Sequence, residues 1–161
     1  MYARNIEQVC GGNPLEDPLF FQEAEYRSAS TYLKNASSVP IDICTGIHDG
    51  HAGSVPVSHA VRAYNALAFP EDRISDEDIK YIVENEKIPA HLCCKDPDPA
   101  FGSHTVLLRK QSANVRLTLF EGAHDILPMV SGDWFARQCS GRKPDWGNGT
   151  ALSDDATRLT H

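Results

Sequence analysis

The segment "VPIDICTGIHDGHAGSVPVSHAVRAYNALAF", residues 39–69, carries the clearest structural pattern in this chain of 161 residues. Residues 39–47 are mostly apolar and β-branched, which predicts a short buried strand. A polar, glycine-rich stretch follows through residue 54. Residues 57–69 then place apolar side chains at helical spacing, namely Val57, Val61, Tyr64 and Ala68. A strand, a loop and a helix in this order predict an α/β fold.

A second strand, loop and helix lie further along the chain. Residues 105–111 and 115–122 are two strand candidates, and the "SAN" between them is a plausible hairpin turn. We expect the strand at 39–47 to be the parallel neighbour of the strand at 115–121, with 105–110 as a hairpin partner. The predicted architecture is a few-stranded, mainly parallel sheet with flanking helices. Helices are expected at 57–68, 75–86 and 125–138, with one more between 16 and 36.

The composition is typical of a globular protein with one domain. The chain is long enough for one domain with a real core, and 41% of its residues are hydrophobic. Its net charge of -7 argues against a nucleic-acid partner, because phosphate binding needs a basic face. No segment approaches the roughly 18 apolar residues of a membrane span, and residues 1–14 lack a signal-peptide pattern. The compartment stays open. The five cysteines form no CxxC pair and are expected to be free thiols, mostly buried.

Two loops combine a strand end with chemically active side chains. The loop Gly46–Val55 offers Asp49, and the loop Glu121–Asp125 offers His124. If their strands are parallel, both loops leave the sheet at the same edge. A histidine base needs a buried carboxylate to fix its tautomer and stabilise its protonated form, so the two would form two thirds of a Ser-His-Asp triad. The structural alternative is that Asp49 caps its own turn and His124 caps the last helix.

A metal site is the competing interpretation of the first loop. His48, Asp49 and His51 lie within four residues, and His59 follows in the next predicted helix. The two loop histidines are three apart without a regular helix to fix their geometry, so this pattern is far less specific than HExxH.

In these stretches the sequence resembles α/β-hydrolases of the prolyl oligopeptidase type. "TGIHDGHAGSVPVSHAVRAYNALA" is similar to the family's acid loop, whose pattern is roughly Gly-x-x-Asp-x-x-Val, although Val55-Pro56 arrives a few residues late. "VRLTLFEGAHDIL" resembles the last strand and catalytic-histidine loop. "SASTYLKNASSVPIDICTG" resembles the turn that leads into the acid strand, with Ala29 in place of the usual proline. The resemblance covers roughly residues 25–138.

The resemblance implies a serine peptidase or esterase in which Asp49 and His124 are catalytic and no metal or cofactor is needed. Residues 1–140 would be the C-terminal portion of the catalytic domain, with 70–104 as an inserted helix and loop and 141–161 as a flexible tail. No Gly-x-Ser-x-Gly nucleophile elbow occurs, so the serine and the oxyanion donors are expected upstream and the isolated chain is expected to be inactive. A peptide or ester would be the parent's substrate.

A non-enzymatic alternative also stays open. The chain could be a remnant or an interaction module whose exposed sheet edge docks onto another chain, because a few-stranded sheet leaves unpaired strand edges. The same edge would also allow the chain to self-associate.

Overall fold

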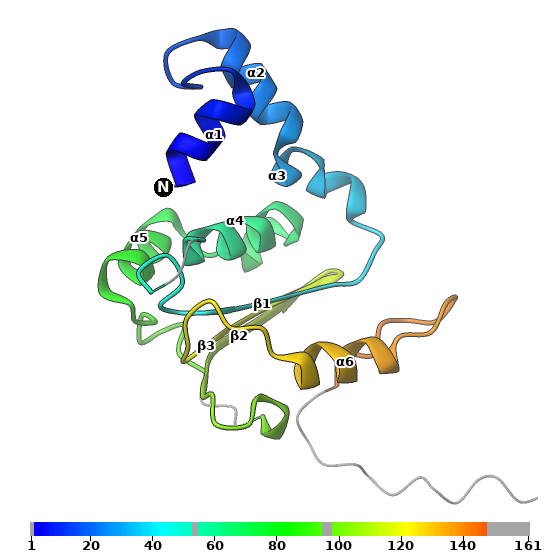
Figure 1. Cartoon of the computed structure of the whole chain (residues 1–161). Helices are drawn as coiled ribbons and strands as arrows, with labels where there is room; N and C mark the ends of the chain where they lie inside the picture. The colour runs from blue at the N-terminus through cyan, green and yellow to red at the C-terminus, as the bar shows by residue number, and fades with distance from the viewer. Residues whose placement is uncertain (1, 53–54, 95–97, 148–161) are drawn as a thin grey trace, which may run out of the picture.

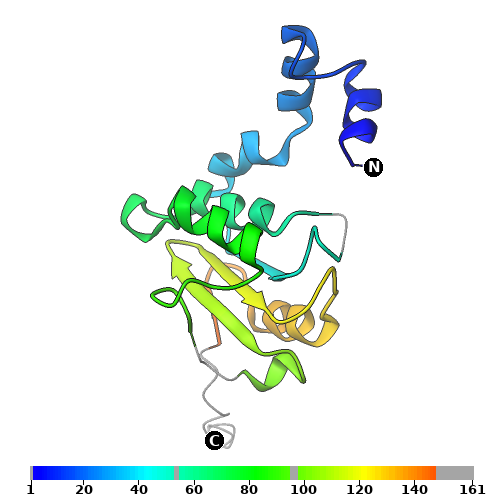
Figure 2. The same cartoon turned by 90° about the vertical axis from the view of Figure 1, so that its left-hand side faces the viewer.

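The structure is a mixed α/β arrangement built on a three-stranded sheet with helices on both faces (Figures 1 and 2). It is a computed structural model that describes residues 2–52, 55–94 and 98–147. The strands are β1 (Ile41–Gly46), β2 (Val106–Ser112) and β3 (Val115–Phe120), in the order β1-β3-β2. β1 is parallel to β3, and β2 forms an antiparallel hairpin with β3, so both pairing predictions are confirmed. The sheet is therefore mixed and not mainly parallel as expected.

The three predicted helices downstream of β1 are present. α4 (Val57–Leu67) and α5 (Asp76–Asn85) lie together on one face of the sheet, and α6 (Pro128–Arg137) lies on the other (Figures 1 and 2). α6 begins three residues later than the predicted residue 125, because the residue before a proline avoids helical backbone angles and Leu127 has φ -104° and ψ 86°.

The N-terminal segment is helical beyond the predicted range. It contains α1 (Tyr2–Cys10), α2 (Pro18–Arg27), α3 (Ala29–Tyr32) and the 3-10 turn η1 (Leu33–Ala36). α1 and α2 stand off from the sheet, beyond α4 (Figure 1). Several apolar side chains of these two helices and of the turn between them are exposed: Val9, Leu15, Leu19, Phe21 and Tyr26. A cavity of about 1010 Å³ separates this segment from α4. The predicted insertion at 70–104 holds α5 and two further 3-10 turns, η2 (Pro70–Asp72) and η3 (Pro99–Phe101).

The main core lies between the sheet and the helices α4 and α5. β3 is the central strand, and every one of its residues is buried. Its alternate side chains Val115, Leu117 and Leu119 belong to one apolar cluster with α4 and α5 residues that include Val61, Tyr64 and Ile82. Burying each such side chain contributes about 1.5–3 kcal/mol. The apolar stripes read from the sequence are therefore the ones that hold this face together.

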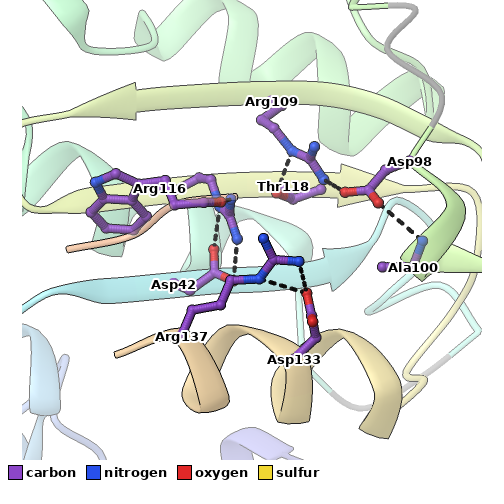
Figure 3. Close-up of polar contacts among 9 residues, drawn as sticks. Asp42, Asp98, Ala100, Arg109, Arg116, Thr118, Asp133 and Arg137 are labelled. Atoms are coloured by element: carbon purple, nitrogen blue, oxygen red, sulfur yellow. Dashed lines mark hydrogen bonds and ion pairs between the residues drawn. The ribbon is translucent and has the colours of Figure 1, made fainter. Parts of the chain in front are cut away.

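The opposite face of the sheet is polar over β1 and the start of β3 (Figure 3). Arg116 donates two hydrogen bonds to Asp42, at 2.8 Å and 2.9 Å, and both side chains are only 9% exposed. Arg109 from β2 donates to Asp98 at 2.8 Å and to Thr118 at 3.3 Å. A bidentate pair from facing residues satisfies charges that burial would otherwise penalise heavily.

Trp146 contacts this polar face, although a flexible tail was expected from residue 141. Arg116 donates a hydrogen bond to the Trp146 carbonyl, and its guanidinium lies over the Trp146 ring, 5.6 Å from the centroid. Gln138 of the segment after α6 donates to the Asp145 carbonyl at 2.8 Å. The remaining predicted tail, 148–161, lies outside the described residues.

The five cysteines are free, as expected. Only Cys10 is buried, while Cys44, Cys93 and Cys139 are exposed, so the expectation of mostly buried thiols is wrong.

Replacing Asp42 by Asn should strongly destabilise the fold. The substitution leaves the buried Arg116 guanidinium without its charge partner, which costs on the order of 3 kcal/mol. The measurement is the free energy of unfolding from urea titration. The matched control is Asp133→Asn, which removes the exposed Arg137–Asp133 pair of α6 and should cost no more than about 0.5 kcal/mol. Equal losses in the two variants would contradict a structural role for the buried pair.

Candidate functional site

The parallel pairing of β1 and β3 continues beyond both strands. The Ile47 N–H donates to the Phe120 carbonyl at 2.9 Å, and the His48 N–H donates to the Gly122 carbonyl at 3.0 Å. The acid loop and the histidine loop therefore run side by side as they leave the sheet. Gly46 makes this possible, since a Cβ there would lie 2.2 Å from the Ala123 oxygen and 2.4 Å from the Gly122 carbonyl carbon.

Asp49 lies at the inner side of this pair of loops and is only 4% exposed. Its Oδ2 accepts a hydrogen bond from the Thr45 hydroxyl at 3.3 Å, and its Oδ1 accepts one from the Val55 N–H at 3.3 Å. Its own carbonyl accepts from the Val57 N–H at 3.1 Å, which ties the loop to the start of α4. A buried carboxylate needs such partners, and here they also fix its orientation.

His124 completes the site. Its Nδ1 lies 2.9 Å from Asp49 Oδ2, so the predicted contact between these two residues is confirmed. The bond to Asp49 is the main cause that raises the pKa of His124 above its ordinary value, and the Asp49 charge adds to it. A carboxylate at Nδ1 places the ring proton there in the neutral form, which leaves the Nε2 lone pair available. Nε2 has no hydrogen-bond partner in the described part of the chain, and the side chain is 56% exposed.

Of the two capping roles considered as the structural alternative, only the one for Asp49 is found. Its bond to the Val55 N–H closes the loop, as a turn-capping aspartate would. His124 does not cap the last helix, because α6 has Leu127 at its N-cap and no side-chain capping bond there. The neighbouring Asp125 instead accepts from the Ala123 N–H at 2.8 Å, so it is Asp125 that closes the histidine loop.

The metal interpretation of the first loop is wrong for this structure. Asp49 faces His124, His48 lies between Glu86 and Glu121, and His51 bonds the Val83 carbonyl through Nε2 at 2.8 Å. The three side chains therefore share no common point. Within residues 2–52, 55–94 and 98–147, no group of three His, Cys, Asp or Glu side chains is arranged to hold a metal ion.

Sequence reasoning missed two acidic residues at this edge of the sheet. His48 Nδ1 lies 2.6 Å from Glu86 Oε2, and its Nε2 lies 2.5 Å from Glu121 Oε1. Glu121 directly follows a predicted strand and could have been singled out as a polar residue at a strand end. Glu86 carries no comparable signal, because its position depends on how α5 packs against α4.

The His124 ring reaches the surface, whereas its partner Asp49 is buried. Neither Asp49 nor His124 lines the cavity below the N-terminal helices. No serine hydroxyl is hydrogen-bonded to His124 among the described residues. Asp49 and His124 thus offer an oriented base without a nucleophile beside it.

The chain matches no family model, no curated protein and no solved structure. None of its described helices has the length and apolar character needed to cross a membrane. Any assignment of function therefore depends on the sequence motifs and the geometry of this site.

Gly46→Ala should separate the two loops. The added methyl group meets backbone atoms of residues 122 and 123, and relieving such overpacking typically costs about 1–3 kcal/mol. Urea unfolding measures the loss. Gly132→Ala is the matched control, since a Cβ at Gly132 meets nothing within 4 Å and alanine should stabilise the interior of α6 by roughly 0.5–1 kcal/mol. An unchanged free energy of unfolding in Gly46→Ala would contradict the close approach of the two loops.

Asp49→Asn should lower the pKa of His124 toward its ordinary value of 6.5. The amide removes both the charge and the strongest acceptor that favour the protonated ring. The measurement is the pH titration of the His124 ring protons by NMR. Asp125→Asn is the control and should lower the pKa less, because the Asp125 charge is the weaker cause of the shift. An unchanged midpoint in Asp49→Asn would disprove the contact in solution.

Proposed function

We propose that this chain is the C-terminal part of the catalytic domain of a serine hydrolase with an α/β-hydrolase fold, of the prolyl oligopeptidase type. The observation that carries the proposal is the 2.9 Å contact between Asp49 Oδ2 and His124 Nδ1, formed where two adjacent parallel strands end. This arrangement agrees with the acid-loop and histidine-loop motifs of the family. The chain order, acid before histidine, agrees with it as well.

In this proposal the two residues divide the work of proton transfer. His124 Nε2 removes the proton from a serine hydroxyl as that oxygen attacks an acyl carbon, and then delivers it to the leaving group. Asp49 holds Nδ1–H and stabilises the imidazolium formed in between. Burial of the carboxylate supports this role, because its hydrogen bond is then less exposed to competition from water. A second cycle with water releases the acid product and restores the serine.

The nucleophile and the oxyanion donors come from outside this chain. Two N–H groups where the loops run side by side already have acceptors, since His48 donates to the Gly122 carbonyl and Ala123 donates to Asp125. In the described part of the chain β1 pairs with β3 alone, so its other edge is open for a further parallel strand. A strand added there would end at the same edge of the sheet as the pair. The substrate class is a peptide or an ester.

A non-catalytic interaction module is the second candidate. The open edge of β1 and the exposed apolar side chains of the N-terminal helices favour it, since both are features that partners cover. The same surfaces allow self-association of the chain.

The test begins with the transcript that encodes the chain. We expect an in-frame Gly-x-Ser-x-Gly upstream of the Met1 codon, and a protein made from that longer frame should be labelled at serine by a fluorophosphonate probe. Asp49→Asn and His124→Ala should each slow ester hydrolysis by roughly ten-thousandfold or more. The control is His91→Gln, which removes a histidine bonded to Asp78 away from the site and should leave the rate unchanged.

Two outcomes would overturn the hydrolase proposal. One is a reading frame without any upstream serine elbow. The other is a longer protein whose labelling does not depend on His124. If, in addition, the chain alone sediments as a stable dimer, the interaction module becomes the better account.

A further inference from the structure

We propose that His48 is a positioning residue: as an imidazolium between Glu86 and Glu121, it holds the His124 loop in register with the loop of Asp49. This role of His48 acts on the Asp49–His124 contact itself, whatever reaction that contact serves. His48, Glu86 and Glu121 are called the His48 bridge below.

Each ring nitrogen of His48 faces a carboxylate. Nδ1 lies 2.6 Å from Glu86 and Nε2 lies 2.5 Å from Glu121. A neutral imidazole has one N–H and one lone pair, whereas a carboxylate can only accept. Both contacts are hydrogen bonds only when both nitrogens carry protons. The bridge is therefore complete in one protonation state of His48 and loses one bond in the other.

The His48 bridge connects segments that are far apart in the sequence. His48 directly precedes Asp49, and Glu121 lies three residues before His124. Glu86 is the C-cap of α5 and has left-handed backbone angles, with φ 51° and ψ 38°. Three separate segments thus meet on one ring: the acid loop, the histidine loop and the end of α5.

The histidine loop is anchored to the rest of the sheet at its first residue, where the Glu121 N–H donates to the Thr105 carbonyl at 2.8 Å and the Glu121 carbonyl lies 2.9 Å from His104 Nδ1. Its side chains add little burial. Glu121, His124, Asp125 and Ile126 are exposed, and Ile126 is 84% exposed. Among the described residues, the hydrogen bonds between this loop and the acid loop are the His48 N–H bond to the Gly122 carbonyl, the Asp49–His124 bond and the Glu121 contact of the bridge. Weakening the bridge therefore acts directly on the other two.

The groups that surround His48 favour its charged form. Glu121 and Glu86, through their hydrogen bonds, raise the pKa of His48 above its ordinary value of 6.5, and Glu121 has the larger effect. Nearby, His51 Nδ1 lies 3.7 Å from Glu86 Oε1, and His104 bonds the Glu121 carbonyl. As pH rises through the raised pKa, His48 loses its charge and the two carboxylates face a ring that can donate to only one of them. The stabilisation is present below pH 6.5 and is lost above the folded-state pKa.

The test is hydrogen exchange of the residue 48 amide, followed by NMR from pH 6 to 9 and corrected for intrinsic exchange. In the wild type the protection factor should fall about two- to fivefold as His48 deprotonates, the range expected for partly exposed ion pairs. His48→Arg keeps a forked cation at every pH, so protection should stay high and flat. In His48→Gln the protection factor should be as low at every pH as that of the wild type at pH 9. His91→Gln, which removes another exposed histidine–carboxylate contact, should behave as the wild type.

These measurements separate the bridge from the titration of His124, which is retained in His48→Arg. The proposal would be overturned if the protection factor of the residue 48 amide fell with pH in His48→Arg as much as in the wild type. It would also be overturned if that amide were fully protected in His48→Gln. A second readout needs no variant. Ring nitrogen shifts should show His48 more than half protonated at pH 6.5, and a mainly neutral ring there would also overturn it. None of these readouts requires hydrolase activity, so the bridge and the proposed function fail independently.

Discussion

The parallel register of β1 on β3 is the constraint on which the site depends. Gly46 pairs with Phe120, so the acid loop and the histidine loop leave the sheet at the same level and in the same direction. Asp49 lies three residues beyond the end of β1, and His124 lies four beyond the end of β3. A slip of two residues would move the loops apart by about 6–7 Å, at roughly 3.3 Å per residue, and no side-chain rearrangement could restore a 2.9 Å contact.

The polar face of the sheet supports the same register from the opposite end of the strands. Asp42 and Arg116 are direct partners in the β1–β3 ladder, and their ion pair is buried. With a slip of two, Asp42 would face Thr118 or Asn114 and the guanidinium would lose its carboxylate. An apolar pair would tolerate such a shift more readily, because hydrophobic contact is not directional. A costly buried ion pair here thus contributes specificity of alignment, and the Asp49–His124 contact benefits from it.

Sequence patterns predict features that depend on neighbouring residues better than contacts between residues far apart in the chain. Strand β1 and helix α4 were predictable, because residue period and proline positions are local signals. The contact of Asp49 with His124 joins residues 75 apart and was predictable only from the expected parallel pairing of the two strands that precede them. The His48 bridge was not, since Glu86 reaches His48 only through the packing of α5. The later start of α6 follows from a local rule at Leu127 that the helical pattern alone overlooks. The contact of Trp146 with Arg116 joins residues 30 apart, and no sequence pattern predicted it.

The two histidines of this edge differ in a way that separates their chemistry. His124 has one carboxylate partner, buried, on one nitrogen, which leaves the other nitrogen free to exchange a proton with a bound group. His48 has a carboxylate on each nitrogen, so both protons are held and no lone pair is exposed while the bridge is intact. The raised pKa of each therefore has a different consequence. It makes the neutral His124 ring a stronger base, whereas it favours the cationic form of His48 between two carboxylates. Residue type and proximity alone would give the two histidines the same role. The number and the burial of their carboxylate partners give them different ones.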